Sequence, residues 1–125
     1  MRKIKTIYRE IERAQAAIRR AEAALPRLQA RMNNAIARLA KAGYEFKGDG
    51  SDPMNCINNV RLWSIAYTAN EARKGIERLN SKIYCLKMDL DCLNMELDIT
   101  EEATRNKGPA RHGRRAAPAA LWHSR

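Results

Sequence analysis

The chain contains few residues with reactive side chains, and three of them are cysteines. Cys56, Cys85 and Cys92 cannot all pair within one chain, because their number is odd. Cys85 and Cys92 are two helical turns apart, about 10 Å along one helix face, which is too far for a shared metal ion or an intrachain disulfide. We therefore expect a soft apolar role for these thiols, with a disulfide between two copies of the chain as the alternative.

Catalytic chemistry has little support among the other residues. Both histidines, His112 and His123, lie in a C-terminal segment that contains no acidic residue. Gly48 and Gly50 are not followed by the lysine and hydroxyl residue of a phosphate-binding loop, and no nucleophile or metal-binding helix motif occurs. We therefore expect no enzyme activity, no cofactor, no metal and no small-molecule substrate.

An apolar line in the second half of the chain is the leading candidate for a protein-binding surface. Its members recur at alternating spacings of three and four residues: Cys85, Met88, Cys92, Met95 and Ile99. Methionine and cysteine side chains are adaptable, which suits a surface that another protein covers. Coverage by the first helix or by the C-terminal tail is the alternative.

A second candidate surface lies where most of the aromatic residues gather, around the predicted loop. Trp63 and Tyr67 are one helical turn apart there, and Tyr44 and Phe46 precede them. These side chains either close a small core at the loop or anchor a partner protein, because aromatic residues often dominate binding energy. Trp63 and Tyr67 are the predicted interface residues of this group.

The chain also has a large excess of positive charge. It contains 24 lysines and arginines against 14 acidic residues, a formal net charge of +10, which favours anionic partners such as DNA or RNA. The candidate nucleic-acid-binding residues lie in the first predicted helix and in the tail: Arg9, Arg13, Arg19, Arg20, Arg27, Arg31, Arg38, Arg111, Arg114 and Arg115. No base-reading motif accompanies them, so this binding would be nonspecific in sequence. A solvated face partly neutralised by the second helix is the alternative.

Two long helices must position all of these residues. From Ile4 to Leu39, apolar residues alternate at spacings of three and four, which is typical of a coiled-coil seam. The same alternation recurs from Leu62 to Leu97, beyond a segment rich in glycine and aspartate. The pattern predicts an all-α protein, with a long antiparallel coiled-coil helical hairpin over residues 1–105: helix 1 at about 2–43, a loop at 44–52 and helix 2 at about 53–105.

Charge and side-chain size favour the antiparallel arrangement. Residues 2–20 carry a net charge of +5 and residues 83–102 a net charge of −5, so folding back brings opposite charges together. If the numbers of facing residues sum to about 104, small residues of one seam meet large residues of the other. Pro26 removes a backbone hydrogen bond but leaves the seam in register, so we expect a kink in helix 1, shared with Gly75 on the facing helix.

The remaining expectations concern the tail and the cellular setting. Residues 106–125 contain glycine, proline and basic residues without an acidic one, which predicts a disordered basic tail. No apolar run is long enough for a membrane span, and none at the start of the chain resembles a secretion signal. Free thiols are typical of a cytoplasmic protein.

Together these patterns predict a non-enzymatic protein–protein interaction module. It would act as an adaptor, an assembly factor or a small inhibitor of a larger assembly such as a nucleic-acid-processing machine. Its partner would be another protein or a second copy of the chain, which would make a homodimer. The alternative is a sequence-nonspecific DNA- or RNA-binding protein that uses the basic face of helix 1 and the tail.

Overall fold

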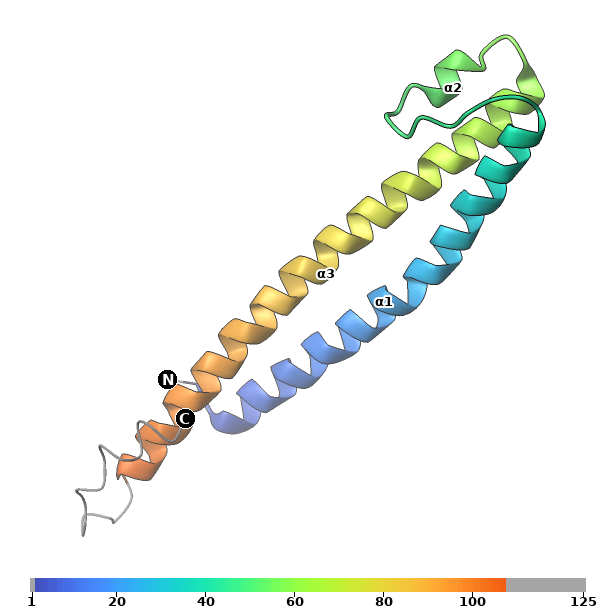
Figure 1. Cartoon of the computed structure of the whole chain (residues 1–125). Helices are drawn as coiled ribbons and strands as arrows, with labels where there is room; N and C mark the ends of the chain where they lie inside the picture. Colours follow the sequence, from blue (N-terminus) through green and yellow to red (C-terminus); the bar gives the residue numbers. More distant parts are fainter. Residues whose placement is uncertain (1, 108–125) are drawn as a thin grey trace. The chain divides into compact units, whose positions relative to one another are not determined.

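The computed structural model of the chain describes residues 2–107, and these fold into three α-helices without a β-strand. In chain order they are α1 (Ile4–Lys41), the short α2 (Asp52–Asn55) and α3 (Val60–Lys107) (Figure 1). The predicted all-α class is confirmed. Within the described range, no helix combines the length and the apolar character that crossing a membrane requires.

Contacts divide the chain into two compact units, and both long helices run through both of them. Unit 1 comprises Met1–Gln15 with Met88–Arg125, and unit 2 comprises Ala16–Lys87. Each unit therefore contains one segment of α1 and one segment of α3. Unit 2 also contains α2 and the segments that join it to the long helices.

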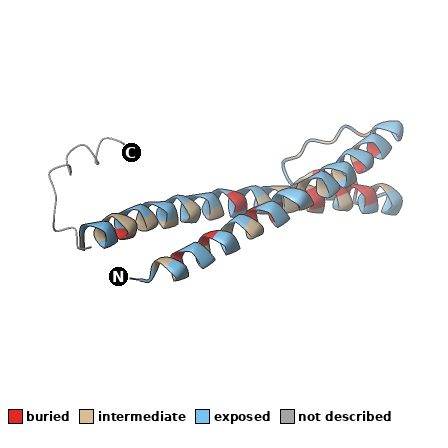
Figure 2. Cartoon of the chain, turned by 90° about the horizontal axis from the view of Figure 1, so that it is seen from below, coloured by how far each residue is buried: buried red, intermediate tan, exposed pale blue. Residues whose placement is uncertain are grey.

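Most of the apolar residues that the structure buries in α1 and α3 belong to the predicted seams. Those that are almost completely covered are Ile7, Ile11, Ile18, Ala21, Ala35 and Leu39 in α1, and Ile65, Ala69, Ala72 and Ile83 in α3. Figure 2 shows the buried residues following α1 and α3 as interrupted stripes, with exposed residues between them. This periodic burial explains why the two helices form, because each one buries a single apolar face.

The core of unit 2 lies where α1 ends and α3 begins. Its buried cluster consists of Ala35, Leu39, Cys56, Ile65, Ala66 and Ala69. Tyr44 and Phe46 are partly buried and pack against this cluster, whereas Trp63 and Tyr67 stay exposed. The aromatic residues near the loop are thus divided between the core and the surface.

Unit 1 joins its two helix segments through polar contacts as well as apolar ones. Arg2 forms ion pairs with Glu96 of α3 and with Glu10 of α1. The Tyr8 hydroxyl donates a hydrogen bond of 2.9 Å to the carboxylate of Glu101. Because these groups are exposed to solvent, the ion pairs contribute little to stability.

The end of α1 follows from Gly43, as the sequence predicts. Gly43 has φ +89°, a left-handed conformation that glycine adopts without strain. Its N–H donates to the carbonyl of Ala40, and the N–H of Tyr44 donates to the carbonyl of Leu39 at 2.9 Å. These two bonds satisfy the last carbonyls of α1, so the helix ends within two residues of the predicted boundary.

The prediction of one continuous second helix from residue 53 is wrong. Pro53 does open a helix, but α2 ends at Asn55 after a single turn. A new helix then begins at Val60, because the side chain of Asn59 accepts a hydrogen bond of 3.1 Å from the N–H of Leu62 and so caps α3. At its other end α3 includes residues 106 and 107, which the sequence assigned to the tail, and residues 108–125 lie outside the described residues.

Pro26 lies inside α1, which continues through it. The helix therefore does not break into two at this proline, and the kink stays a prediction. Leu28, which follows Pro26 by two residues, lies beside Gly75 of α3. Pro26 and Gly75, the two residues least favourable inside a helix, therefore lie near each other in unit 2.

We expect Gly75→Ala to raise the free energy of unfolding by about 0.5 kcal/mol. Inside a helix, alanine is more favourable than glycine by about 1 kcal/mol in the free energy of helix formation. A Cβ at this position would lie 3.1 Å from Cδ1 of Leu28, which is close, but Leu28 is half-buried and borders a groove that lets its flexible side chain shift. Urea unfolding followed by circular dichroism measures the change. A loss of stability would show that the contact with Leu28 cannot relax.

Candidate protein-interaction surface

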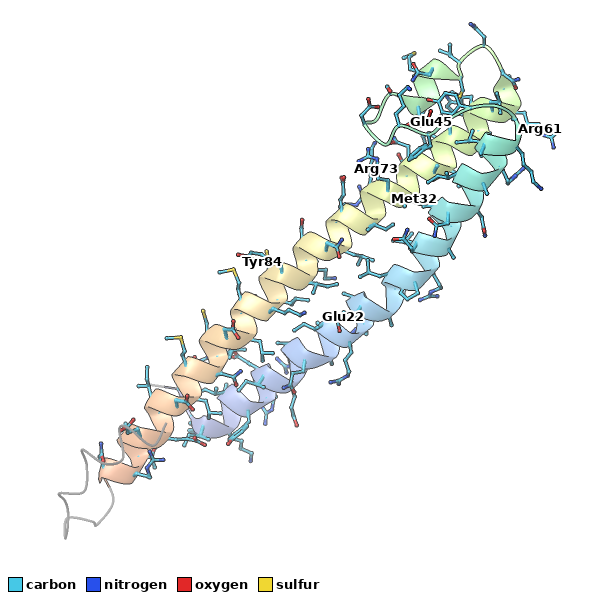
Figure 3. The ribbon with its side chains drawn as sticks, viewed as in Figure 1. Glu22, Met32, Glu45, Arg61, Arg73 and Tyr84 are labelled. Carbon is cyan, nitrogen blue, oxygen red and sulfur yellow. The ribbon has the colours of Figure 1, made fainter. Side chains whose placement is uncertain are left out.

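Four residues of α3 form an exposed apolar face in unit 1, which we call the sulfur-rich face: Met88, Cys92, Met95 and Ile99. Met88, Met95 and Ile99 are 50%, 63% and 60% exposed, and Cys92 is exposed too. In Figure 3, sulfur atoms of α3 project on the side away from α1. These residues are offset by two positions from the buried seam residues of α3, and two positions turn a helix by more than half a circle, so the two sets lie on different sides of the helix.

The sulfur-rich face contains a shallow groove of about 310 Å³. Cys92, Met95 and Ile99 supply its apolar lining, and Glu96 and Thr100 complete it. Hydrogen bonds from Arg2 lower the pKa of Glu96, which keeps this carboxylate ionised and held toward α1. The groove therefore offers a soft apolar surface beside a carboxylate that is paired with Arg2, and an apolar side chain of a partner protein is the kind of group that fits it.

The three cysteines occupy different environments. Cys56 is buried in the core of unit 2, and this burial raises the pKa of its thiol. Cys85 in unit 2 and Cys92 in unit 1 are free and exposed. Among residues 2–107, no group of three or more histidine, cysteine or acidic residues is arranged to hold a metal ion.

The other predicted interface residues lie in unit 2. Trp63 and Tyr67 stack with ring centroids 5.3 Å apart and are 40% and 46% exposed. Tyr84, next to Cys85, is 65% exposed and points away from α1 (Figure 3). The spacing of the apolar line could not single out Tyr84, since it falls outside the alternation of three and four residues.

The predicted nucleic-acid-binding arginines of α1 are all exposed: Arg9, Arg13, Arg19, Arg20, Arg27, Arg31 and Arg38. The first two belong to unit 1 and the other five to unit 2. In the part of the chain that the structure describes, none of the seven takes part in an ion pair. The predicted tail residues Arg111, Arg114 and Arg115 lie outside the described residues.

Comparison with known proteins adds no further constraint on this surface. The chain has no match among protein-family models, curated proteins or solved structures. The functional argument therefore rests on the exposure, charge and packing of its own residues.

Sequence reasoning missed how α3 contributes to the basic surface of unit 2. It treated the arginines of α1 as one outer face, whereas Arg61 and Lys82 of α3 line grooves together with arginines of α1. Only the pairing of the two helices brings these side chains together, and no spacing within one helix reveals it.

Proposed function

We propose that the protein is a non-enzymatic interaction module that binds another protein through the sulfur-rich face. One observation carries this proposal: Met88, Cys92, Met95 and Ile99 follow one another at helical spacing and all are exposed. Soluble chains rarely expose contiguous apolar faces without a use, since such faces promote association. An adaptor, an assembly factor and a small inhibitor of a larger assembly all use this kind of surface.

We further propose that α1 and α3 pair as an antiparallel coiled coil within each unit and thereby hold this face rigid. In unit 2, Leu28 contacts the position of Gly75, and Lys87 pairs with Glu22 at 3.5 Å. In unit 1, Arg2 reaches Glu96. Within unit 2, the contacting residue of α1 advances from Glu22 to Leu28 while that of α3 goes back from Lys87 to Gly75, which supports an antiparallel pairing there.

The chemistry around the face favours a particular kind of partner. Asp89 and Asp91 are exposed on the same stretch of α3, so the apolar face has negative charge beside it. A partner with an apolar centre and basic residues at its rim would complement both features. In a homodimer, the sulfur-rich faces of the two copies would have to pack out of register, because otherwise Asp89 and Asp91 of one copy would lie against the same residues of the other.

Affinity capture with a matched pair of variants tests the proposal. A tagged full chain is captured from nuclease-treated lysate of the cells that make it, together with an untagged copy that reports self-association. We expect Met95→Asp to abolish recovery of the partner, because a carboxylate in the centre of an apolar interface would be buried without a counter-charge. Asn94→Asp adds the same charge at an exposed neighbouring position outside the face and should leave recovery unchanged. Equal recovery with all three chains would contradict the proposal.

A second candidate function is sequence-nonspecific binding of DNA or RNA. Unit 2 contains thirteen basic and six acidic residues, a formal net charge of +7, so most of the excess charge of the chain lies there. Charge of this kind attracts polyanions at long range, and contacts with individual phosphates then determine affinity.

A further inference from the structure

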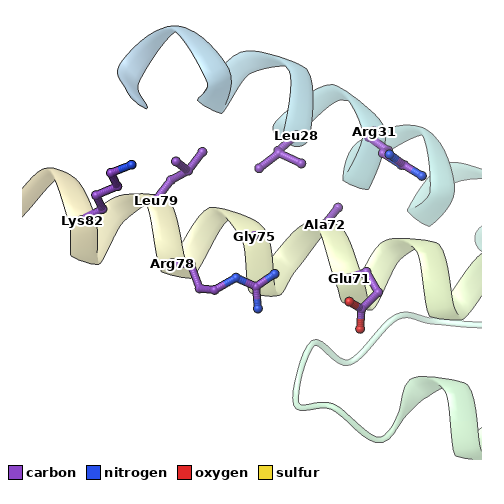
Figure 4. Close-up of a pocket in the computed structure, with 8 residues that line it drawn as sticks. All are labelled: Leu28, Arg31, Glu71, Ala72, Gly75, Arg78, Leu79 and Lys82. Carbon is purple, nitrogen blue, oxygen red and sulfur yellow. The ribbon is translucent and has the colours of Figure 1, made fainter. Parts of the chain in front are cut away.

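Three neighbouring grooves follow the junction of α1 and α3 in unit 2. The first, of about 500 Å³, has Leu28 and Arg31 of α1 on one side and Ala72, Leu79 and Lys82 of α3 on the other (Figure 4). The second, of about 400 Å³, shares Arg31 with the first. The third, of about 500 Å³, shares Arg38, Arg61 and Ile65 with the second. Because neighbouring grooves share lining residues, they form one continuous track.

The charges along this track have almost entirely one sign. Six basic side chains line it: Arg31, Arg38, Lys41, Arg61, Arg78 and Lys82. The one carboxylate in the lining belongs to Glu71, and Lys74 lies 3.4 Å from it. Within residues 2–107, none of the six basic residues forms an ion pair.

This arrangement differs from the usual flanks of paired helices, where opposite charges face each other. Arg38 of α1 and Arg61 of α3 instead line the same two grooves. Like charges held close together repel, so an external anion between them would relieve a cost that the chain alone does not compensate. Ser64, Thr68 and Asn34 in the second groove add neutral hydrogen-bonding groups and no competing charge.

We propose that this basic track binds the phosphate backbone of a nucleic-acid duplex. The proposal rests on the second candidate function and assigns it a site. On α3 the basic residues extend from Arg61 to Lys82, about 31 Å at 1.5 Å per residue, a distance over which one strand of a duplex presents about nine phosphates. Four of the six basic residues are arginines, whose planar guanidinium groups bind phosphate oxygens in pairs.

The lining of the grooves also indicates which nucleic acid fits. No aromatic residue lines any of the three grooves, so the track offers no surface on which unpaired bases could stack. No lining residue belongs to a base-reading motif either. The duplex would therefore be held by its backbone alone, and the binding would be independent of base sequence.

Duplex binding by the full chain, measured as a function of salt, tests this site. The probe is a fluorescent DNA duplex of about 25 base pairs, with a single strand of the same length and polyglutamate as competitors. Six phosphate contacts predict a slope of log K against log salt of about −5. The test variant is Arg38→Glu with Arg61→Glu, and its matched control is Arg19→Glu with Arg20→Glu, which reverses two exposed charges of the same unit outside the grooves.

The groove variant should bind the duplex about 60-fold more weakly near 0.1 M salt, because each lost phosphate contact reduces affinity about eightfold at that salt concentration. The slope of log K against log salt should become about two units less steep. The control pair should lose much less, and duplex should compete better than single strand or polyglutamate. If the groove variant does not fold, Arg38→Gln with Arg61→Gln replaces it. Equal losses in both pairs would overturn the site while leaving nucleic-acid binding intact. Absence of duplex binding at low salt, or stronger competition by polyglutamate, would overturn the function as well.

Discussion

Leu39→Ala is expected to lower the free energy of unfolding by about 3 kcal/mol, one of the largest effects of any single substitution in this chain. Leu39 is completely buried in the core of unit 2. Its neighbours Ala35, Ala66 and Ala69 are small and belong to helices, so they cannot move far enough to fill the space that the leucine leaves. The cost therefore includes a cavity as well as the lost burial of apolar surface.

Ile57→Ala serves as the control for this prediction. Ile57 lies between α2 and α3 and is 57% exposed, so its truncation should change the free energy of unfolding by less than about 1 kcal/mol. Urea unfolding of both variants at neutral pH gives the comparison. Similar losses from the two substitutions would show that the core of unit 2 does not control the stability of the protein.

Asp52→Ala is expected to cost a similar amount, about 3 kcal/mol, through lost hydrogen bonds rather than lost packing. The carboxylate of Asp52 is fully buried and accepts hydrogen bonds from the Tyr44 hydroxyl at 2.6 Å and from the backbone N–H groups of Lys47 and Gly48 at 2.8 and 2.9 Å. Removing the carboxylate leaves three donors in partly buried hydrogen bonds without their acceptor. The loop before α2 should then lose its fixed conformation.

The same contacts give stability a dependence on pH. Burial alone would raise the pKa of Asp52, but the hydrogen bonds from Lys47, Tyr44 and Gly48 outweigh it and leave the pKa below its ordinary value. Stabilisation by the ionised carboxylate is therefore complete above about pH 4, where the unfolded chain also ionises, and is lost as the pH falls through the lower pKa of the folded protein. Urea unfolding at pH 7 and at pH 3 should show a smaller acid-induced loss in Asp52→Ala than in the wild type.

Asp49→Asn provides a matched comparison, because Asp49 is exposed and its carboxylate accepts hydrogen bonds from Ser51. These bonds lower the pKa of Asp49 as well, but solvent around the exposed carboxylate weakens their effect on stability. Its substitution should change the free energy of unfolding much less than Asp52→Ala does. If Asp49→Asn altered the pH dependence as much as Asp52→Ala does, the buried carboxylate would not be its source.

Much of the fold follows from spacing in the sequence. The seam positions from Ile4 to Leu39 and from Leu62 to Leu97 are buried or half-buried, because a helix that covers one face must place its apolar residues at those intervals. Gly43 ends α1 as predicted, since its left-handed conformation lets the N–H groups of Gly43 and Tyr44 bind carbonyls of the last turn of α1. These features depend on local rules that a single sequence displays.

The break between α2 and α3 was not predicted, although Asn59 directly before an apolar helix is a recognisable cap. Pro53 indicates an earlier helix start, and nothing in the spacing shows that the carboxylate of Asp52 accepts hydrogen bonds from Lys47 and Gly48 in the preceding loop. Neither could the sequence reveal the basic track, because it depends on which residues of α3 lie opposite Arg31 and Arg38. The break has a local signal in Asn59, whereas the basic track depends on contacts between two helices, which spacing within one helix cannot encode.

Photo-crosslinking from position 95 tests the central claim most directly, because it reports what covers the sulfur-rich face. A benzophenone-bearing residue replaces Met95 in one chain and Glu12, which is exposed on α1 in the same unit, in a control chain. After irradiation in the cells that make the protein, position 95 should give a discrete product with one partner protein or a second copy, and position 12 should not. No product from position 95, or the same products from both positions, would contradict the claim.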